Sequence, residues 1–157
     1  MSEDGPVARV RAALLAAGHA DTLAAFPAGT RTAADAAAAI GCDVAQIAKS
    51  IVFRSGSQAM LVVASGAVRI DMARASAAFG VPLSRADAAF VRDSTGFAIG
   101  GVSPVGLREG CRLLLDRSLA ALDPVWAAAG SPSHVFRTTP AWLTRLTGAD
   151  FADVAEG

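Results

Sequence analysis

The sequence predicts an α+β fold: one compact domain over residues 1–157, in which a mixed sheet of β-hairpins is surrounded by helices. Apolar residues recur at helical spacing in some segments and form short continuous runs, typical of buried strands, in others. The length of 157 residues fits one domain, and neither an internal repeat nor a Pro/Gly/Ser-rich linker divides it. With 53% hydrophobic residues and a net charge of zero, a disordered chain is excluded.

The first expected helix is amphipathic. Its apolar residues recur at helical spacing and are Val7, Val10, Leu14 and Ala17. Gly18 can end this helix, and His19 is expected on the surface. We therefore expect residues 1–25 to form an N-terminal helical extension of the same domain.

A second helix and a β-hairpin are expected next. Thr32 and Asp35 have the spacing of a capping box, which predicts an alanine-rich helix that stops at Gly41. The apolar runs 50–53 and 60–63 flank a Ser-Gly-Ser turn, so they predict a buried β-hairpin.

Two further helices are expected in the middle of the chain. Asp71 can cap a helix that runs through Phe79. Ser84, with Asp87 three residues later, can cap another that runs through Val91.

The last third combines strands with a helix. Residues 112–115 and 134–136 are short apolar runs and are expected to be strands. The final helix has Thr139 as its N-cap, a proline in its first turn and Gly148 at its end.

The basic residues are unusual in kind and in place. Of the 14 basic residues, Lys49 is the single lysine and the other 13 are arginines. A lysine ammonium is a compact donor, whereas a guanidinium is a planar fork, so a position that keeps lysine can need that shape; a chance surface lysine is the alternative. Residues 49–117 carry nine basic and five acidic groups, which could hold a few phosphates or form an ordinary solvated surface but are too few for tight non-specific binding to nucleic acid.

Several other classes of protein are excluded. The longest strongly apolar stretch, 59–64, is far shorter than the roughly 18–20 residues of a membrane span. The acidic N-terminus lacks the features of a secretory signal, so we expect a cytoplasmic protein. Cys42 and Cys111 stand alone and fit neither a disulfide framework nor a zinc site, and no other cluster has the spacing of metal ligands. We expect no metal and no cofactor.

The segment 96–106 is the densest unusual motif. Four glycines, a proline and a serine interrupt an apolar run, which indicates a loop that approaches a ligand or a structural turn between core strands. It lacks the Gly-Lys-Ser/Thr of a phosphate-binding loop, and its glycine spacing is not that of a dinucleotide fingerprint. Ser103 is a poor nucleophile candidate, because Val105 replaces the second glycine of a hydrolase elbow and Pro104 has no N–H for an oxyanion hole.

Two motifs together resemble a known family. Residues 46–53, which contain Lys49, and the glycine-rich residues 95–106 are similar to the YbaK/EbsC family, free-standing relatives of the editing domain in bacterial prolyl-tRNA synthetases. The resemblance covers roughly residues 25–155 and implies the fold of that editing domain. The implied activity is hydrolysis of the ester that joins a wrong amino acid to tRNA. Such editing is needed because a synthetic site rejects a competitor that differs by one methylene by only about 1–3 kcal/mol.

The resemblance also implies site residues. Lys49 is expected to orient the 3′ end of the tRNA, and the N–H groups of Gly100 and Gly101 to polarise the ester carbonyl, so that water or a group of the substrate attacks. The loop from Gly100 to Pro104 is expected to bind the aminoacyl group. The expected substrate-binding residues are Phe53, Ile99, Val102, Ser103, Pro104 and His134.

The implied substrate is tRNA carrying a small amino acid: Cys, Ala, 2-aminobutyrate, Ser or Thr, with tRNA for proline as the first carrier to test. An aminoacyl-tRNA synthetase or an elongation factor is a further candidate partner, whereas DNA and membranes are not expected. One alternative is a non-catalytic module of the same fold that binds a nucleotide or an RNA end. A second is a small-molecule ester hydrolase with Ser103 or Cys111 as nucleophile.

Overall fold

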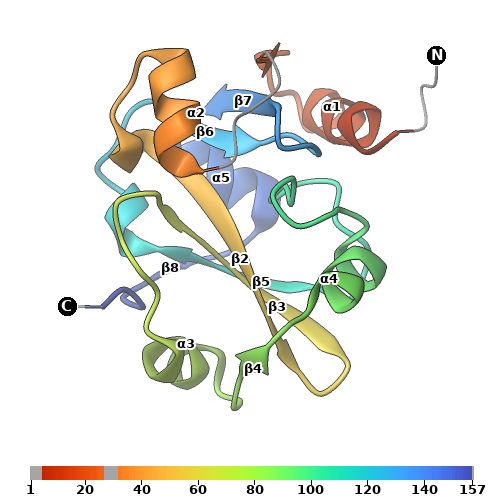
Figure 1. Cartoon of the computed structure of the whole chain (residues 1–157), viewed down its shortest axis with the longest axis vertical. Helices are drawn as coiled ribbons and strands as arrows, with labels where there is room; N and C mark the ends of the chain where they lie inside the picture. The colour runs from red at the N-terminus through yellow and green to blue at the C-terminus, as the bar shows by residue number, and fades with distance from the viewer. Residues whose placement is uncertain (1–4, 27–31, 157) are drawn as a thin grey trace.

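A computed structural model describes residues 5–26 and 32–156. Within these residues the strands form one eight-stranded mixed sheet in the order β1-β7-β6-β2-β3-β5-β8, with β4 paired to β2 (Figure 1). The strands are β1 (Leu23–Ala25), β2 (Ile47–Ser55), β3 (Gln58–Ser65), β4 (Ser84–Arg85), β5 (Arg112–Asp116), β6 (Val125–Ala128), β7 (His134–Thr138) and β8 (Phe151–Ala152). The α-helices are α1 (Pro6–Ala16), α2 (Ala33–Ile40), α3 (Met72–Phe79), α4 (Ala88–Thr95) and α5 (Pro140–Thr147). The predicted α+β class, with β-hairpins in a mixed sheet and helices around it, is confirmed.

The predicted hairpin of β2 and β3 runs through the middle of the molecule (Figure 1). Ser55 pairs with Gln58, so Gly56 and Ser57 form a two-residue turn. Both strands are longer than the apolar runs predicted, because pairing continues into the polar ends. The hairpin carries the lysine of the candidate site on β2.

The capping residues predicted from the sequence are found at the ends of several helices. At α2 the Thr32 hydroxyl accepts a hydrogen bond from the Asp35 N–H, and the Asp35 carboxylate accepts one from the Thr32 N–H. Gly41 ends α2 in the left-handed conformation, with φ +87°. The predicted caps Asp71 of α3 and Thr139 of α5 are also confirmed.

Two sequence predictions are wrong. Ser84 does not cap a helix through Val91; Ser84 lies in β4 and pairs with β2, while the Asp87 carboxylate accepts the Phe90 N–H and caps α4, which continues to Thr95. His19 is not on the surface: it is 5% exposed. Its Nε2 lies 3.0 Å from Thr138 Oγ1, a partner 119 residues away.

The apolar core lies on both faces of the sheet. On β3, Leu61 and Val63 join a cluster that includes residues of α1, α4 and α5, whereas Met60 and Val62 join a second cluster beneath α3. This alternation follows from the two-residue period of a strand. Because both faces of β3 are covered, its sequence is a continuous apolar run rather than an alternating one. None of the helices in the described ranges is long and apolar enough to cross a membrane.

Candidate functional site

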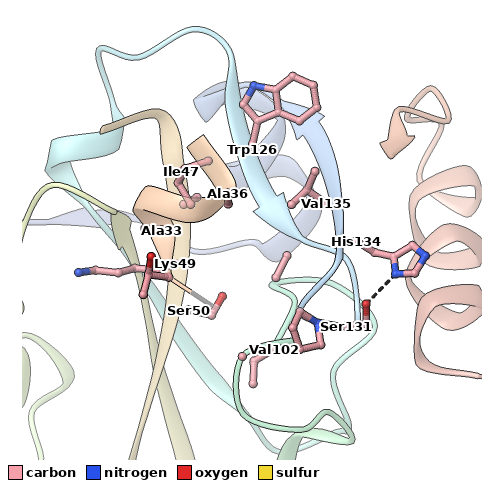
Figure 2. Close-up of a pocket in the computed structure, with 15 residues that line it drawn as sticks. Ala33, Ala36, Ile47, Lys49, Ser50, Val102, Trp126, Ser131, His134 and Val135 are labelled. Atoms are coloured by element: carbon pink, nitrogen blue, oxygen red, sulfur yellow. Dashed lines mark hydrogen bonds between the residues drawn. The ribbon is translucent and has the colours of Figure 1, made fainter. Parts of the chain in front are cut away.

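A pocket opens where β2 changes its strand partner. On one edge, β6 pairs with Ile47 and Ala48 and β4 pairs with Phe53 and Arg54. Between these two points, residues 49–52 have no strand partner on that edge among the described residues. The pocket at this gap has a volume of about 180 Å³. Its lining comes from α2, β2, the glycine-rich loop and the β6–β7 hairpin, and comprises Thr32, Ala33, Ala36, Ile47, Ala48, Lys49, Ser50, Gly100, Val102, Trp126, Ala128, Ser131, Pro132, His134 and Val135 (Figure 2).

The pocket is small and largely apolar. Its volume of about 180 Å³ is below the roughly 300–1,000 Å³ of ordinary ligand pockets, so it suits a small group of a larger substrate. Alanine and valine side chains form much of the wall, and neither Asp nor Glu is among the described lining residues. The described residues also contain no group of three or more His, Cys, Asp or Glu that could hold a metal ion. Among the described lining residues, the site therefore offers hydrogen-bonding groups and one basic side chain besides His134, that of Lys49.

Lys49 supplies a cation beside the pocket, with its side chain extending away from Ser50 (Figure 2). Its Nζ donates a hydrogen bond to the Val68 carbonyl at 2.5 Å, and no described acidic side chain forms an ion pair with it. Burial lowers the pKa of Lys49 below its ordinary value, and the positive charge of Arg69 lowers this pKa further. Because an ammonium has three donors, two of them have no hydrogen-bond partner among the described residues.

The glycine-rich loop reaches the pocket because it approaches the β6–β7 connection closely. A Cβ at Gly101 would lie 2.7 Å from Ser131 Cα and 2.9 Å from Ser131 N, so only glycine fits there. Gly100 has φ +91°, a conformation that glycine adopts without strain. The Gly101 N–H donates to the Ala98 carbonyl at 3.0 Å, whereas no described residue accepts a hydrogen bond from the Gly100 N–H.

Arg9 of α1 holds the glycine-rich loop in place through its guanidinium. Its guanidinium donates to the carbonyls of Gly106, at 3.0 Å, and Gly96, at 2.5 Å. The same group lies 4.5 Å from the centroid of the Phe97 ring. One side chain of the N-terminal helix thus fixes both ends of the loop.

A serine–histidine pair lies on the β6–β7 side of the pocket. Ser131 Oγ and His134 Nδ1 are 2.6 Å apart and share a hydrogen bond (Figure 2). Ser131 Oγ also accepts the Ser133 N–H at 3.1 Å. It also lies 3.3 Å from Ser133 Oγ, and which atom of the Ser131–His134 pair donates depends on the tautomer of the imidazole.

The structure brings part of the predicted site together. Lys49, Gly100, Val102 and His134 line one pocket, and Gly101 packs behind it against Ser131. The other four predicted residues lie elsewhere, and their roles stay predictions. Phe53 packs on the α3 side of the sheet, and Ile99 is 58% exposed. Ser103 is buried with its hydroxyl accepting the Val105 N–H, and Pro104 lines a second pocket next to α1 and α5.

Sequence reasoning missed Thr32, Ser50 and Ser131. Thr32 was recognised as a helix cap only, and the two serines have no spacing signal in the sequence. The position of Ser50 next to Lys49 is the one signal that could have indicated Ser50 as a pocket residue, since neighbouring residues of a strand can both line a pocket at the edge of that strand.

Comparisons with known proteins identify chains of similar sequence and fold. The uncharacterized protein YwhH of Bacillus subtilis (strain 168) is 35% identical over 123 residues, which is 78% of each chain. A crystal structure of a protein proposed to be a trans-editing enzyme for prolyl-tRNA synthetase superposes with a TM-score of 0.92 and 44% identity, covering 99% of this chain and 100% of that one. A scaffold protein from work on epitope backbone grafting has a TM-score of 0.92 and 42% identity, covering 98% of this chain and 99% of that one.

The family profile extends over the whole site. The profile of the aminoacyl-tRNA editing domain matches residues 27–146, a range that contains every described residue lining the pocket. The chain therefore belongs to the aminoacyl-tRNA editing domain family.

Proposed function

We propose that the protein is a trans-editing deacylase, which hydrolyses the ester of tRNA mischarged with a small amino acid. The observation that carries this proposal is that Lys49 and the glycine-rich loop line the same small pocket. Because the pocket is smaller than an ordinary ligand site, the aminoacyl group would enter it while the tRNA stays outside. The relative proposed to edit for prolyl-tRNA synthetase makes tRNA for proline the first carrier to test.

In this mechanism Lys49 holds the 3′ end of the tRNA. Its ammonium has no acidic partner among the described residues and keeps two free donors beside Arg69. A phosphate or ribose oxygen of the terminal adenosine would accept these hydrogen bonds. Such an anion would also offset the repulsion between the two cations.

The Gly100 N–H is the candidate donor to the ester carbonyl, since the Gly101 N–H is already bonded to Ala98. Where a water oxygen attacks the carbonyl carbon, the bond between this carbon and the ribose oxygen breaks, the ribose oxygen takes the proton that the water loses, and the free amino acid leaves. Where a group of the substrate attacks, it becomes acylated as the ribose oxygen leaves with its proton, and water then hydrolyses the new acyl bond. One positioned donor of this kind contributes about 10²–10³-fold in rate in other acyl-transfer enzymes.

The test is a deacylation panel with tRNA for proline charged with Ala, Cys, Ser, Thr or 2-aminobutyrate. Wild-type protein is expected to cleave at least one of these esters faster than the uncatalysed rate. The Lys49→Ala variant is expected to lose most of this activity. Lys49→Arg is expected to recover little, because a planar guanidinium replaces a compact ammonium.

The matched control is Arg92→Ala. Arg92 is exposed on α4 and does not line the pocket, so this variant removes one positive charge without changing the site. Full activity of Lys49→Ala would remove Lys49 from the mechanism. Binding of the tRNA end without cleavage of any ester would favour the non-catalytic binding module instead.

A further inference from the structure

Ser50 carries a buried polar atom that the fold does not use. Its hydroxyl oxygen is buried and has no hydrogen-bond partner among the described residues, although Ser50 lines the pocket. A buried hydroxyl without a partner destabilises a folded chain, and native structures contain few of them. Alanine residues 33, 36, 48 and 128 show that a side chain without a hydroxyl suits this wall. A ligand that pairs with the hydroxyl would account for it.

The main chain of Ser50 also faces the pocket. The Ile47 carbonyl accepts the Gly66 N–H at 2.6 Å, so residue 47 is hydrogen-bonded toward β3. Antiparallel pairs alternate, and Ser50 therefore forms a non-hydrogen-bonded pair with Val63. Its N–H and C=O point to the other edge of β2, where pairing with β6 has ended at Ala48.

The α-amino group of an aminoacyl ester needs hydrogen-bond acceptors such as the Ser50 carbonyl and hydroxyl oxygens. This α-amino group is charged over much of the neutral pH range, and an ammonium donates hydrogen bonds but accepts none. Neither Asp nor Glu is among the described lining residues, so neutral oxygens must serve. Ser131 Oγ and His134 Nδ1 already share a hydrogen bond.

We propose that Ser50 binds the α-amino group of the aminoacyl ester through its main-chain carbonyl and its hydroxyl oxygen. This assignment rests on the proposed deacylase function and adds to it a receptor for the amino group. Figure 2 shows the Ser50 side chain on the side of β2 that faces Val102, whereas the Lys49 side chain extends the opposite way. Two neighbouring residues thus hold the two ends of the ester, the ribose side at Lys49 and the amino side at Ser50. Because the hydroxyl is sealed from water, the contact includes a change of the Ser50 rotamer about χ1.

The experiment measures binding of a stable amide analogue, adenosine with a 3′-alanylamino group, and of its N-acetyl form. Both probes are titrated into wild type, Ser50→Ala and Ser50→Thr by NMR. The Ser50→Ala variant is expected to bind the free-amine analogue about tenfold more weakly and the N-acetyl analogue as wild type does. Ser50→Thr keeps the hydroxyl on a residue that suits a strand, and is expected to restore binding of the free amine.

A thermal unfolding scan separates this role from a structural one. Ser50→Ala removes an unpaired buried hydroxyl, so its Tm is expected to equal or exceed that of wild type. An equal loss of affinity for both analogues, or no loss for either, would overturn the assignment. The same titrations with seryl analogues give a further check. If Ser50→Ala changes the preference between alanyl and seryl analogues whether or not they are N-acetylated, the hydroxyl recognises the amino-acid side chain and the assignment is overturned. Failure of wild type to bind the free-amine analogue would overturn it as well.

The deacylation panel reports on the proposed function separately. If Ser50 affects binding of the free amine as expected but wild type cleaves no mischarged tRNA, the receptor assignment stands and the deacylase assignment fails. If wild type cleaves a mischarged tRNA while Ser50→Ala binds both analogues normally, the reverse holds.

Discussion

Replacing Gly101 with alanine should damage the pocket by moving its wall. The added Cβ would lie 2.7 Å from Ser131 Cα, 2.9 Å from Ser131 N and 3.0 Å from Ser131 C. These are backbone atoms, so no side chain can rotate away. Restoring a contact of 3.4 Å would require the glycine-rich loop and the Ser131 segment to separate by about 0.7 Å. Overpacking of this kind costs about 1–3 kcal/mol.

In a chain of this length, that cost corresponds to a fall in Tm of roughly 2–12 °C. Because a displacement of about 1 Å can reduce an enzyme's rate about 10²-fold, we expect deacylation to fall by tenfold or more. The assays are thermal unfolding and turnover of the best substrate in the panel, each with Gly110→Ala as control. Gly110 also has a positive φ, +94°, but a Cβ there meets nothing within 4 Å, and it does not line the pocket.

Gly110→Ala should therefore lose some stability through backbone strain yet keep the turnover of wild type. The reasoning is refuted if Gly101→Ala unfolds at the wild-type temperature with wild-type activity. It is also refuted if both glycine variants lose activity to the same degree, since a general loss of stability would then explain both.

Two further predictions concern charged residues. Arg9→Ala should lower both the Tm and the deacylation rate, because the Gly96 and Gly106 carbonyls lose their hydrogen-bond donor. The control is Arg11→Ala, which breaks only an exposed ion pair and should change the free energy of unfolding by about 1 kcal/mol or less. Equal effects of the two variants on turnover would contradict the role given to Arg9. The lowered pKa of Lys49 predicts that kcat/KM, after subtraction of spontaneous hydrolysis, falls on the alkaline side at a lower pH than an ordinary lysine would give. A pH profile that is the same in Lys49→Ala would exclude this assignment.

Elements with local signals could be predicted from the sequence. The capping box of Thr32 and Asp35 and the apolar runs of the β2–β3 hairpin are contained within a few residues, and both were predicted correctly. Ser84 was misassigned because the sequence offers two possible caps, and pairing with the distant β2 decides between them. His19 was misplaced for the same kind of reason, since Thr138, Phe136 and Trp142, which surround its ring, are far along the chain.

The candidate site divides in the same way. Lys49 and the glycine-rich loop are visible as motifs, so a resemblance could pair them, and the structure places both at one pocket. Ser50 and Ser131 could not be found by spacing, because their relevance depends on where β2 leaves β6 and on how closely Gly101 approaches. Burial of a hydroxyl without a partner can be recognised only in three dimensions.

The contacts of Arg9 show that the folded domain depends on residues that precede the region matched by the family profile. The family profile begins at residue 27, eleven residues after α1 has ended, so a fragment cut to that boundary would retain every pocket-lining residue. It would nevertheless lose the Arg9 guanidinium, which donates hydrogen bonds to both ends of the glycine-rich loop. It would also lose Val10 and Leu14, two fully buried core side chains. Fragments designed for crystallisation or domain fusion should therefore keep α1, although its sequence lies outside the region that defines the family.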